Sequence, residues 1–274
     1  QASVEHLRLA METLTSTMPI AEAVSVSESD VVGIPGLKLT PTKLRSPRHL
    51  MYFHGGGYVS GSALTHQGLT SQLAAACDAL TWSVDYRLAP EAPFPAAIDD
   101  AVSAYKSLLE TGIDPQYILF AGDSAGGGLC VSASLKAREL NLPLPAGLIM
   151  MSPWLDLTAS GCSYQSKAVL DPIINADSLR MTKAAYLGDA DEHHPLASPI
   201  FADLSGMPPM LIQVGTRERL LSDAITMAEK VGLANGEVSL ELCPNMVHVF
   251  QAYYPFLSEA RQAIKRIGEW VRKT

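Results

Sequence analysis

Short apolar runs recur along the chain and are separated by longer segments with a helical period. Each run is bounded by turn-forming residues such as Gly, Pro, Asp or Ser, which is typical of buried strands. We expect strands near residues 49–53, 80–86, 117–122, 148–152, 210–215 and 238–242. Strands that alternate with helices form a mainly parallel sheet with helices on both faces. The pattern therefore predicts an α/β fold.

The longer segments place apolar residues three and four positions apart, which is the period of an amphipathic helix. We expect helices at residues 65–77, 96–110, 125–140, 221–235 and 258–271. These helices fill most of the gaps between the expected strands. No internal repeat interrupts the alternation.

Two segments lie outside this alternation. Residues 4–18 are amphipathic, and residues 156–204 form a long insertion that is too apolar for a solvated loop. An insertion after a sheet strand usually lies at the carboxyl edge, where open α/β sheets bind ligands. We expect a helical cap from residues 1–30 and 156–204 over a core of residues 31–155 and 205–274. Surface padding is the alternative.

Composition and charge exclude several classes of protein. The 274 residues are 47% hydrophobic and 18% charged, which suits one compact α/β core. The formal net charge of −8, without a cluster of Lys and Arg longer than a pair, argues against a nucleic-acid partner. The four cysteines lack C-x-x-C spacing, so neither a zinc site nor a disulfide framework is indicated.

No stretch approaches the roughly 18 unbroken apolar residues of a membrane span. The first residues also lack the charged and apolar regions of a signal peptide. We therefore expect a soluble protein with no membrane partner, and a reducing cytoplasm fits the cysteine pattern best.

Gly122-Asp123-Ser124-Ala125-Gly126 matches the G-x-S-x-G pattern of a nucleophile elbow. An apolar run precedes the motif and a helical segment follows it, so the context is strand, sharp turn and helix. The flanking glycines are needed because side chains there would collide with the neighbouring strand and helix. Ser124 is the expected nucleophile, and a helix-capping serine is the alternative.

His54-Gly55-Gly56-Gly57 follows directly after the strand expected at residues 49–53. A tetrahedral intermediate of acyl transfer carries an oxyanion, and preorganised backbone N–H groups stabilise it. We expect the amides of Gly55, Gly56 and Ala125 to form this oxyanion hole. A phosphate cradle is the other use of a glycine run, but no G-K-[ST] follows.

The general base must follow the last strand of such a fold, because the chain order is nucleophile, acid and histidine. Of the seven histidines only His248 lies there, and a structural core histidine is the alternative. His54 precedes the nucleophile and is interpreted as a residue that shapes its loop.

The acid should lie just past the strand at residues 210–215, where Glu218 is the first carboxylate and Asp223 the second. Glu218 is the better candidate because it is still in the loop. Asp223 falls inside the expected helix and would point elsewhere, although it stays open as the acid.

Residues 189–194 bring carboxylates and two histidines together and resemble a metal cluster. Adjacent histidines point in different directions, and no H-E-x-x-H spacing occurs, so we interpret this segment as a solvated loop. The expected chemistry needs no metal and no cofactor.

The chain resembles the bacterial hormone-sensitive-lipase-like esterases of the α/β-hydrolase superfamily. The resemblance rests on His54-Gly55-Gly56-Gly57, Asp85-Tyr86-Arg87-Leu88-Ala89-Pro90-Glu91, the Ser124 motif and Ser152-Pro153-Trp154-Leu155-Asp156. It covers the chain from about residue 49 to the C-terminus. The family usually carries Asp as its acid, so Glu218 at that position is a mild departure.

The resemblance implies a carboxylic ester hydrolase that acts on a small-molecule ester with a short acyl chain. It also implies a cap above the cleft and a possible homodimer through the last strand, residues 238–242, which would be an exposed sheet edge. Two other functions stay open. One is a small-molecule-binding receptor of the same fold, although such receptors lack the histidine, and the other is an amidase or acyltransferase.

Overall fold

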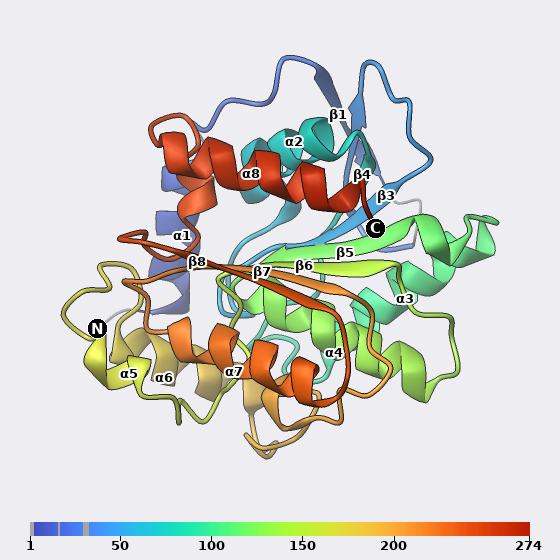
Figure 1. Cartoon of the computed structure of the whole chain (residues 1–274). Helices are drawn as coiled ribbons and strands as arrows, with labels where there is room; N and C mark the ends of the chain where they lie inside the picture. The colour runs from blue at the N-terminus through green and yellow to red at the C-terminus, as the bar shows by residue number, and fades with distance from the viewer. Residues whose placement is uncertain (1–2, 16, 30–32) are drawn as a thin grey trace.

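A computed structural model describes residues 3–15, 17–29 and 33–274. Within them lies an eight-stranded sheet with the order β1-β2-β4-β3-β5-β6-β7-β8 (Figure 1). The strands are β1 (Val24–Ser29), β2 (Gly36–Pro41), β3 (His49–Phe53), β4 (Leu80–Val84), β5 (Ile118–Asp123), β6 (Gly147–Met151), β7 (Met210–Gly215) and β8 (Val238–Cys243). The ladders from β4 through β8 are parallel, whereas β1 pairs with β2, and β2 with β4, in antiparallel fashion.

Helices cover both faces of the sheet (Figure 1). One face carries α2 (Ala63–Cys77) and α8 (Ser258–Val271), and the other carries α3 (Ala96–Glu110), α4 (Ala125–Glu139) and α7 (Leu221–Leu233). The remaining helices are α1 (Val4–Thr15), α5 (Ser163–Ser166) and α6 (Ala176–Leu187), with short 3-10 turns η1 (Pro115–Tyr117), η2 (Pro199–Phe201) and η3 (Phe250–Tyr253).

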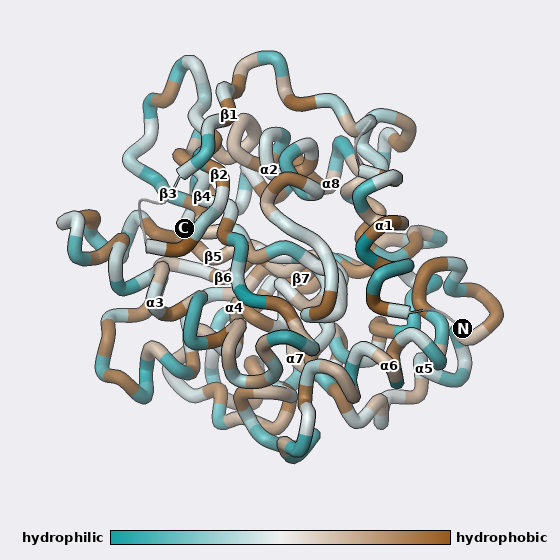
Figure 2. The backbone as a smooth tube through the Cα atoms, turned by 180° about the vertical axis from the view of Figure 1, so that it is seen from behind, coloured by the Kyte–Doolittle hydropathy of each residue, from teal (hydrophilic) through white to brown (hydrophobic). Residues whose placement is uncertain are grey.

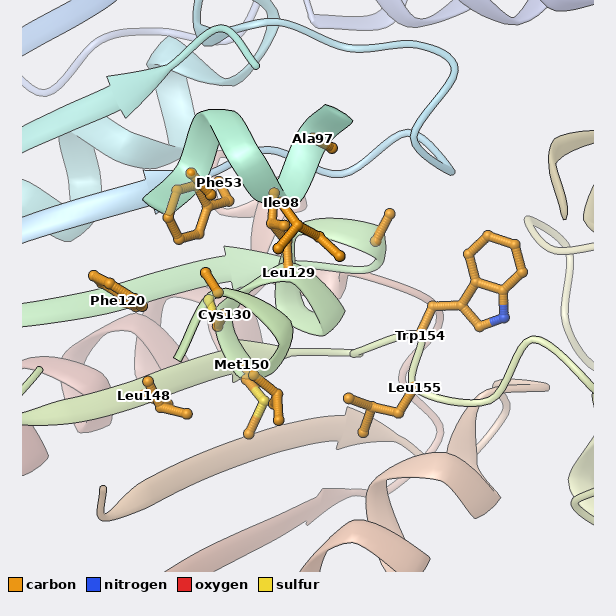
Figure 3. Close-up of a cluster of buried hydrophobic side chains, with 14 of the residues drawn as sticks. Phe53, Ala97, Ile98, Phe120, Leu129, Cys130, Leu148, Met150, Trp154 and Leu155 are labelled. Atoms are coloured by element: carbon orange, nitrogen blue, oxygen red, sulfur yellow. The ribbon is translucent and has the colours of Figure 1, made fainter. Parts of the chain in front are cut away.

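The central strands are buried on both faces, which is why they read as unbroken apolar runs. Successive side chains of β3 alternate between two cores: Leu50 and Tyr52 pack against α2 and α8, and Met51 and Phe53 pack toward α3 and α4. Figure 3 shows the second core, where strand side chains meet helix side chains such as Ile98, Leu129 and Cys130. Both layers exclude water from the strands that carry the site.

The expected elements of the central sheet are confirmed. β3, β7, α3 and α8 have the expected bounds, and the other expected strands and helices differ by at most two residues at either end. Their signal was strong because the central strands are buried along their length, and because α3, α7 and α8 each have one apolar face.

The sequence interpretation missed β1 and β2, and its assignment of residues 1–30 to the cap is wrong in part. β1 belongs to the sheet, so residues from Val24 to Ser29 are part of the core. The strand was overlooked because only Val24 and Val26 are apolar in it, and its alternating polar residues leave a weak pattern at the sheet edge. The proposed boundary itself, between residues 30 and 31, lies outside the described residues.

Helix α1 lies next to α5 and α6 in both views of the molecule (Figures 1 and 2). Arg8 ties α1 to the core: its Nε donates to the carbonyl of Val59 at 2.8 Å, and its two terminal nitrogens donate to Glu91 at 2.8 and 2.7 Å. The N-terminal segment and the insertion after β6 therefore gather above the same part of the sheet.

Strand β3 lies between β4 and β5, so the chain moves to one side of β3 and then crosses to the other. Such a reversal of strand order opens a crevice at the carboxyl ends of the strands. The loops after β3 and β5 lie at this position.

No helix of the described residues is both long and apolar enough to cross a membrane.

Candidate active site

Ser124 occupies the turn between β5 and α4, with φ 51° and ψ −119°. This backbone conformation is unfavourable for a residue with a side chain and persists only where the surroundings enforce it. Its amide donates to the carbonyl of Met151 at 2.9 Å, and its carbonyl accepts from the amide of Trp154 at 2.9 Å. One bond to the end of β6 and one to the loop that follows it thus hold the strained turn.

The glycines around Ser124 are required by close backbone approaches. A Cβ on Gly126 would collide with the carbonyl of Phe53, and a Cβ on Gly122 would collide with the carbonyl of Gly126. Only glycine lets β5 turn this sharply into α4 beside β3. The side chain of Ser124 faces a cavity at the carboxyl ends of the strands.

His248 and Glu218 form a hydrogen-bonded pair that is almost fully buried. Nδ1 of His248 lies 2.9 Å from Oε2 of Glu218, and the glutamate has no exposed surface. His248 follows β8 and lines the same cavity as Ser124. Burial by itself lowers the pKa of His248, but the hydrogen bond to Glu218 and the charge of Glu218 outweigh it, so that pKa is raised above 6.5.

The other oxygen of Glu218 holds the carboxylate in place. Oε1 accepts from the hydroxyl of Ser152 at 2.7 Å and from the amide of Gly215 at 2.5 Å. The carboxylate therefore has little freedom to turn away from the imidazole, and its orientation sets the orientation of the ring.

Asp223 makes a different set of contacts. Its Oδ2 accepts from the amides of Leu155 and Asp156 at 2.9 and 3.0 Å and from the hydroxyl of Tyr164 at 3.1 Å. Burial raises the pKa of Asp223 to about 8. This carboxyl supports the loop after β6, and Glu218 is the carboxylate that contacts His248.

Ser152 is a site residue that the sequence interpretation missed. Its hydroxyl donates to Glu218 and accepts from the amide of Val249 at 3.0 Å, so it joins the acid's loop to the histidine's loop. Ser152 itself has φ 50° and directly follows β6. Its place at the end of an expected strand was the available signal.

The loop after β3 corrects one expected oxyanion donor. The amide of Gly55 donates to Oδ1 of Asp123 at 3.0 Å, so this N–H is committed to a buried carboxylate and is not free for substrate. Gly56 and Gly57 instead line the cavity beside Ser124, both with positive φ, of 118° and 63°. Gly57 replaces Gly55 as a candidate donor, and Ala125 remains as the first residue of α4.

Asp123 is the centre of a buried polar cluster beneath this loop. The hydroxyl of Tyr52 donates to its Oδ1 at 2.5 Å, and Nε2 of His66 lies 3.5 Å from its Oδ2. Although burial opposes both charges, Asp123 raises the pKa of His66 and His66 lowers the pKa of Asp123. Asp123 also accepts the hydrogen bond from the amide of Gly55, so this cluster holds the loop after β3 in place.

His54 is also buried, and its surroundings agree with a loop-shaping residue. Its ring stacks on Tyr86 with centroids 4.2 Å apart, and Nδ1 lies 2.8 Å from the carbonyl of Gly55. Burial lowers the pKa of His54 to about 3, so its ring stays neutral at pH 7.

The cavity in front of Ser124 has a volume of about 340 Å³ and a mostly apolar wall. Side chains of α1, of the insertion, of the loop before α7 and of the segment after His248 form this wall: Leu7, Ala10, Met11, Leu14, Ile173, Ile174, Leu179, Leu220, Val249 and Ala252. The described residues contain no cluster of three or more His, Cys, Asp and Glu side chains that could hold a metal. The arrangement suits an apolar group bound next to a serine hydroxyl, an imidazole and backbone amides.

Comparisons with known proteins agree on the family. A family model for the α/β hydrolase fold matches residues 50–252. An acetyl-hydrolase of Streptomyces hygroscopicus is 43% identical over 225 residues, which are 82% of this chain and 75% of that protein. An esterase of Acinetobacter venetianus is 34% identical over 265 residues, which are 96% of this chain and 87% of that protein.

Among solved structures, the hormone-sensitive-lipase homologue EstE7 from a metagenome library shares 47% identity at a TM-score of 0.96. That match covers 99% of this chain and 93% of the other. A mutant of the esterase E40 shares 41% identity at the same TM-score and covers 100% of this chain and 92% of the other. The chain therefore belongs to the α/β-hydrolase fold family, among the esterases homologous to hormone-sensitive lipase, and is a carboxylic ester hydrolase.

Proposed function

We propose that this enzyme hydrolyses short-chain acyl esters through an acyl-enzyme on Ser124, with His248 as general base and Glu218 as its orienting acid. The observation that carries the proposal is the buried hydrogen bond between His248 and Glu218 at the wall of the cavity that Ser124 faces. Nucleophile, base and orienting acid in this chain order are the parts that acyl transfer requires.

In the first step, Oγ of Ser124 attacks the ester carbonyl while Nε2 of His248 takes the hydroxyl proton. The imidazolium then protonates the leaving alcohol, and the acyl group stays on Ser124. Water attacks that acyl-enzyme with His248 again as base, which releases the carboxylic acid and restores the serine. Glu218 accepts the hydrogen bond from Nδ1 and stabilises the imidazolium in both steps.

The oxyanion of each tetrahedral intermediate would accept hydrogen bonds from the amides of Gly56, Gly57 and Ala125. The amide of Ala125 is at the first turn of α4, where no intrahelical acceptor exists. Donors fixed by the backbone stabilise the developing charge without reorganising, and loss of one such donor typically costs about 3 to 4 kcal/mol.

The apolar cavity supports a short acyl chain as the preferred substrate. Each methylene that enters such a cavity favours binding by about 0.8 kcal/mol until the space is full. A volume of about 340 Å³ is small, and α1 and α6 close it from the cap side. The relative named acetyl-hydrolase agrees with a small acyl group.

A cytoplasmic location is part of the proposal. It is supported by the four cysteines, all of which are free, because free thiols persist in a reducing compartment. Cell fractionation with an antibody against the protein tests this location, and recovery in a secreted fraction would contradict it.

Pre-steady-state hydrolysis of p-nitrophenyl butyrate tests the mechanism. We expect a burst of nitrophenol equal to the enzyme concentration. We expect no turnover in Ser124→Ala, which keeps the fold because the hydroxyl is not needed for packing.

The same assay separates the two rival functions. A receptor would bind the ester without a burst. An amidase or acyltransferase would prefer an anilide or an alcohol acceptor over water in a parallel assay. More than a few per cent residual rate in Ser124→Ala would contradict the assignment of the nucleophile.

A further inference from the structure

The cap helix α6 packs directly on the loop that carries Gly56 and Gly57. A Cβ on Gly57 would lie 3.0 Å from Cγ2 of Thr182 and 3.1 Å from its Cβ, so the threonine is in contact with the glycine backbone. Tyr186 stands one helical turn further along the same face. Its ring stacks on that of Tyr58, the next residue after Gly57, with centroids 3.8 Å apart and planes 9° apart.

The loop needs such support because its backbone is strained. Gly56, Gly57 and Tyr58 all have positive φ, and Tyr58, at 63°, is a bulky residue in a region that glycine normally occupies. That conformation costs roughly 1 to 2 kcal/mol and persists only where the surroundings enforce it. The side chain of Tyr58 is buried, and its ring stacks on Tyr186 in this loop conformation.

Tyr186 is in turn fixed to the core. Its carbonyl accepts from the amide of Phe94 at 2.7 Å, and the ring of Phe94 packs edge-on against it at 5.9 Å between centroids. The carbonyl of Tyr58 accepts from the amide of Ala89 in the same region. Tyr186 thus links α6 to the loop that carries Gly56 and Gly57 and to the loop after β4.

We propose that Tyr186 is a positioning residue for the oxyanion hole: its ring, stacked on Tyr58, holds the amides of Gly56 and Gly57 where the tetrahedral oxyanion forms. The cap therefore contributes to the chemical step as well as enclosing the substrate. This inference rests on the proposed serine mechanism. It assigns the effect to the aromatic ring of Tyr186 and not to its hydroxyl.

The test compares Tyr186→Leu and Tyr186→Phe with Arg180→Ala, whose side chain is on the same helix but exposed. We expect Tyr186→Leu to lower kcat for p-nitrophenyl butyrate at least about tenfold, less than deletion of a donor, which costs about a hundredfold or more. KM should change by less than about threefold, since the amides bind the transition state and not the ground state. Tyr186→Phe keeps the stack and should retain wild-type kcat, as should Arg180→Ala.

A second readout isolates the oxyanion hole. A short-chain trifluoromethyl ketone adds reversibly to Ser124, whose proton passes to His248, and leaves an oxyanion in the position of the intermediate. The inhibition constant of this ketone should rise in Tyr186→Leu by the same factor as kcat falls. An analogue that lacks the ketone forms no oxyanion, and it should bind Tyr186→Leu and the wild type with the same affinity. If Tyr186→Leu does not fold, Tyr58→Leu removes the same stack from the loop side and should show the same pattern.

The inference is overturned if a folded Tyr186→Leu keeps wild-type kcat, if its loss is confined to KM, or if Tyr186→Phe is impaired equally. In any of those cases the serine mechanism would still stand if the wild type shows the burst and Ser124→Ala abolishes it. A wild-type protein that binds the ester without releasing nitrophenol would instead reject the mechanism itself.

Discussion

At the residue scale, the site separates two carboxylates that stand close together in sequence. Glu218 is hydrogen-bonded to His248, and Asp223 holds the loop after β6. We expect Glu218→Gln to lose at least about a hundredfold in kcat, because an amide neither stabilises the imidazolium nor maintains the tautomer. Asp223→Asn should lose little in kcat. The oxygen of its amide can accept hydrogen bonds from the same three donors, and its NH₂ takes the place of the proton on a carboxyl whose pKa is about 8.

Steady-state kinetics of the two variants on one short ester measure this difference, with circular dichroism as the control for folding. The opposite ranking of the two losses would show that Asp223 is the catalytic acid.

The contact with Glu218 also contributes to the pH dependence that we expect of the enzyme. His248 acts as a base only when neutral, and its pKa is raised above 6.5, so kcat/KM should fall as the pH drops through a midpoint above 6.5. Replacing Glu218 by Gln removes the charge that raises this pKa while burial still lowers it, so the midpoint should move to lower pH. A pH series of kcat/KM for both proteins measures the shift, and an unchanged midpoint would mean that another group titrates.

At the element scale, α1 and α6 line one side of the cavity. We expect kcat/KM to peak at short acyl chains, because a longer chain must displace cap residues once the cavity is full. Met11→Ala removes part of the α1 wall and should shift the peak to longer chains. Deletion of α1 should flatten the profile and promote aggregation by exposing apolar surface.

A series of p-nitrophenyl esters from acetate to laurate gives the profile. Leu9→Ala is the matched control, since Leu9 lies on the same helix with 62% of its surface exposed. Preference for long-chain triglycerides with interfacial activation would show that the cap is not a closed lid.

At the scale of the whole molecule, β8 is the last strand in the sheet order. Its pairing partner is β7, and Leu242 on it is 46% exposed. Because an unpaired edge can extend a sheet into a second copy, we expect a homodimer through β8. Light scattering at micromolar concentration should give twice the chain mass of 29.3 kDa. Leu242→Lys should shift the protein toward monomer, and a monomeric wild type would reject this interface.

The sequence determined the features that depend on residues close together in the chain. The turn at Ser124 needs Gly122 and Gly126 beside a buried strand and a helix, and those parts are contiguous. The buried strands and the amphipathic helices were predicted because their apolar pattern is repeated within each element. The order of Ser124, Glu218 and His248 along the chain also followed from the expected alternation of strands and helices.

Only the tertiary structure decided which groups are already engaged. The amide of Gly55 lost its expected role because Asp123, 68 positions later in the chain, accepts its hydrogen bond. Ser152 joins the loops of Glu218 and His248 because β6 lies between β5 and β7, which no local pattern states. Tyr186 meets Tyr58 across 128 residues in the same way. A hydrogen bond or a ring contact depends on how two segments of the chain lie relative to each other in space. A sequence pattern describes only one segment at a time.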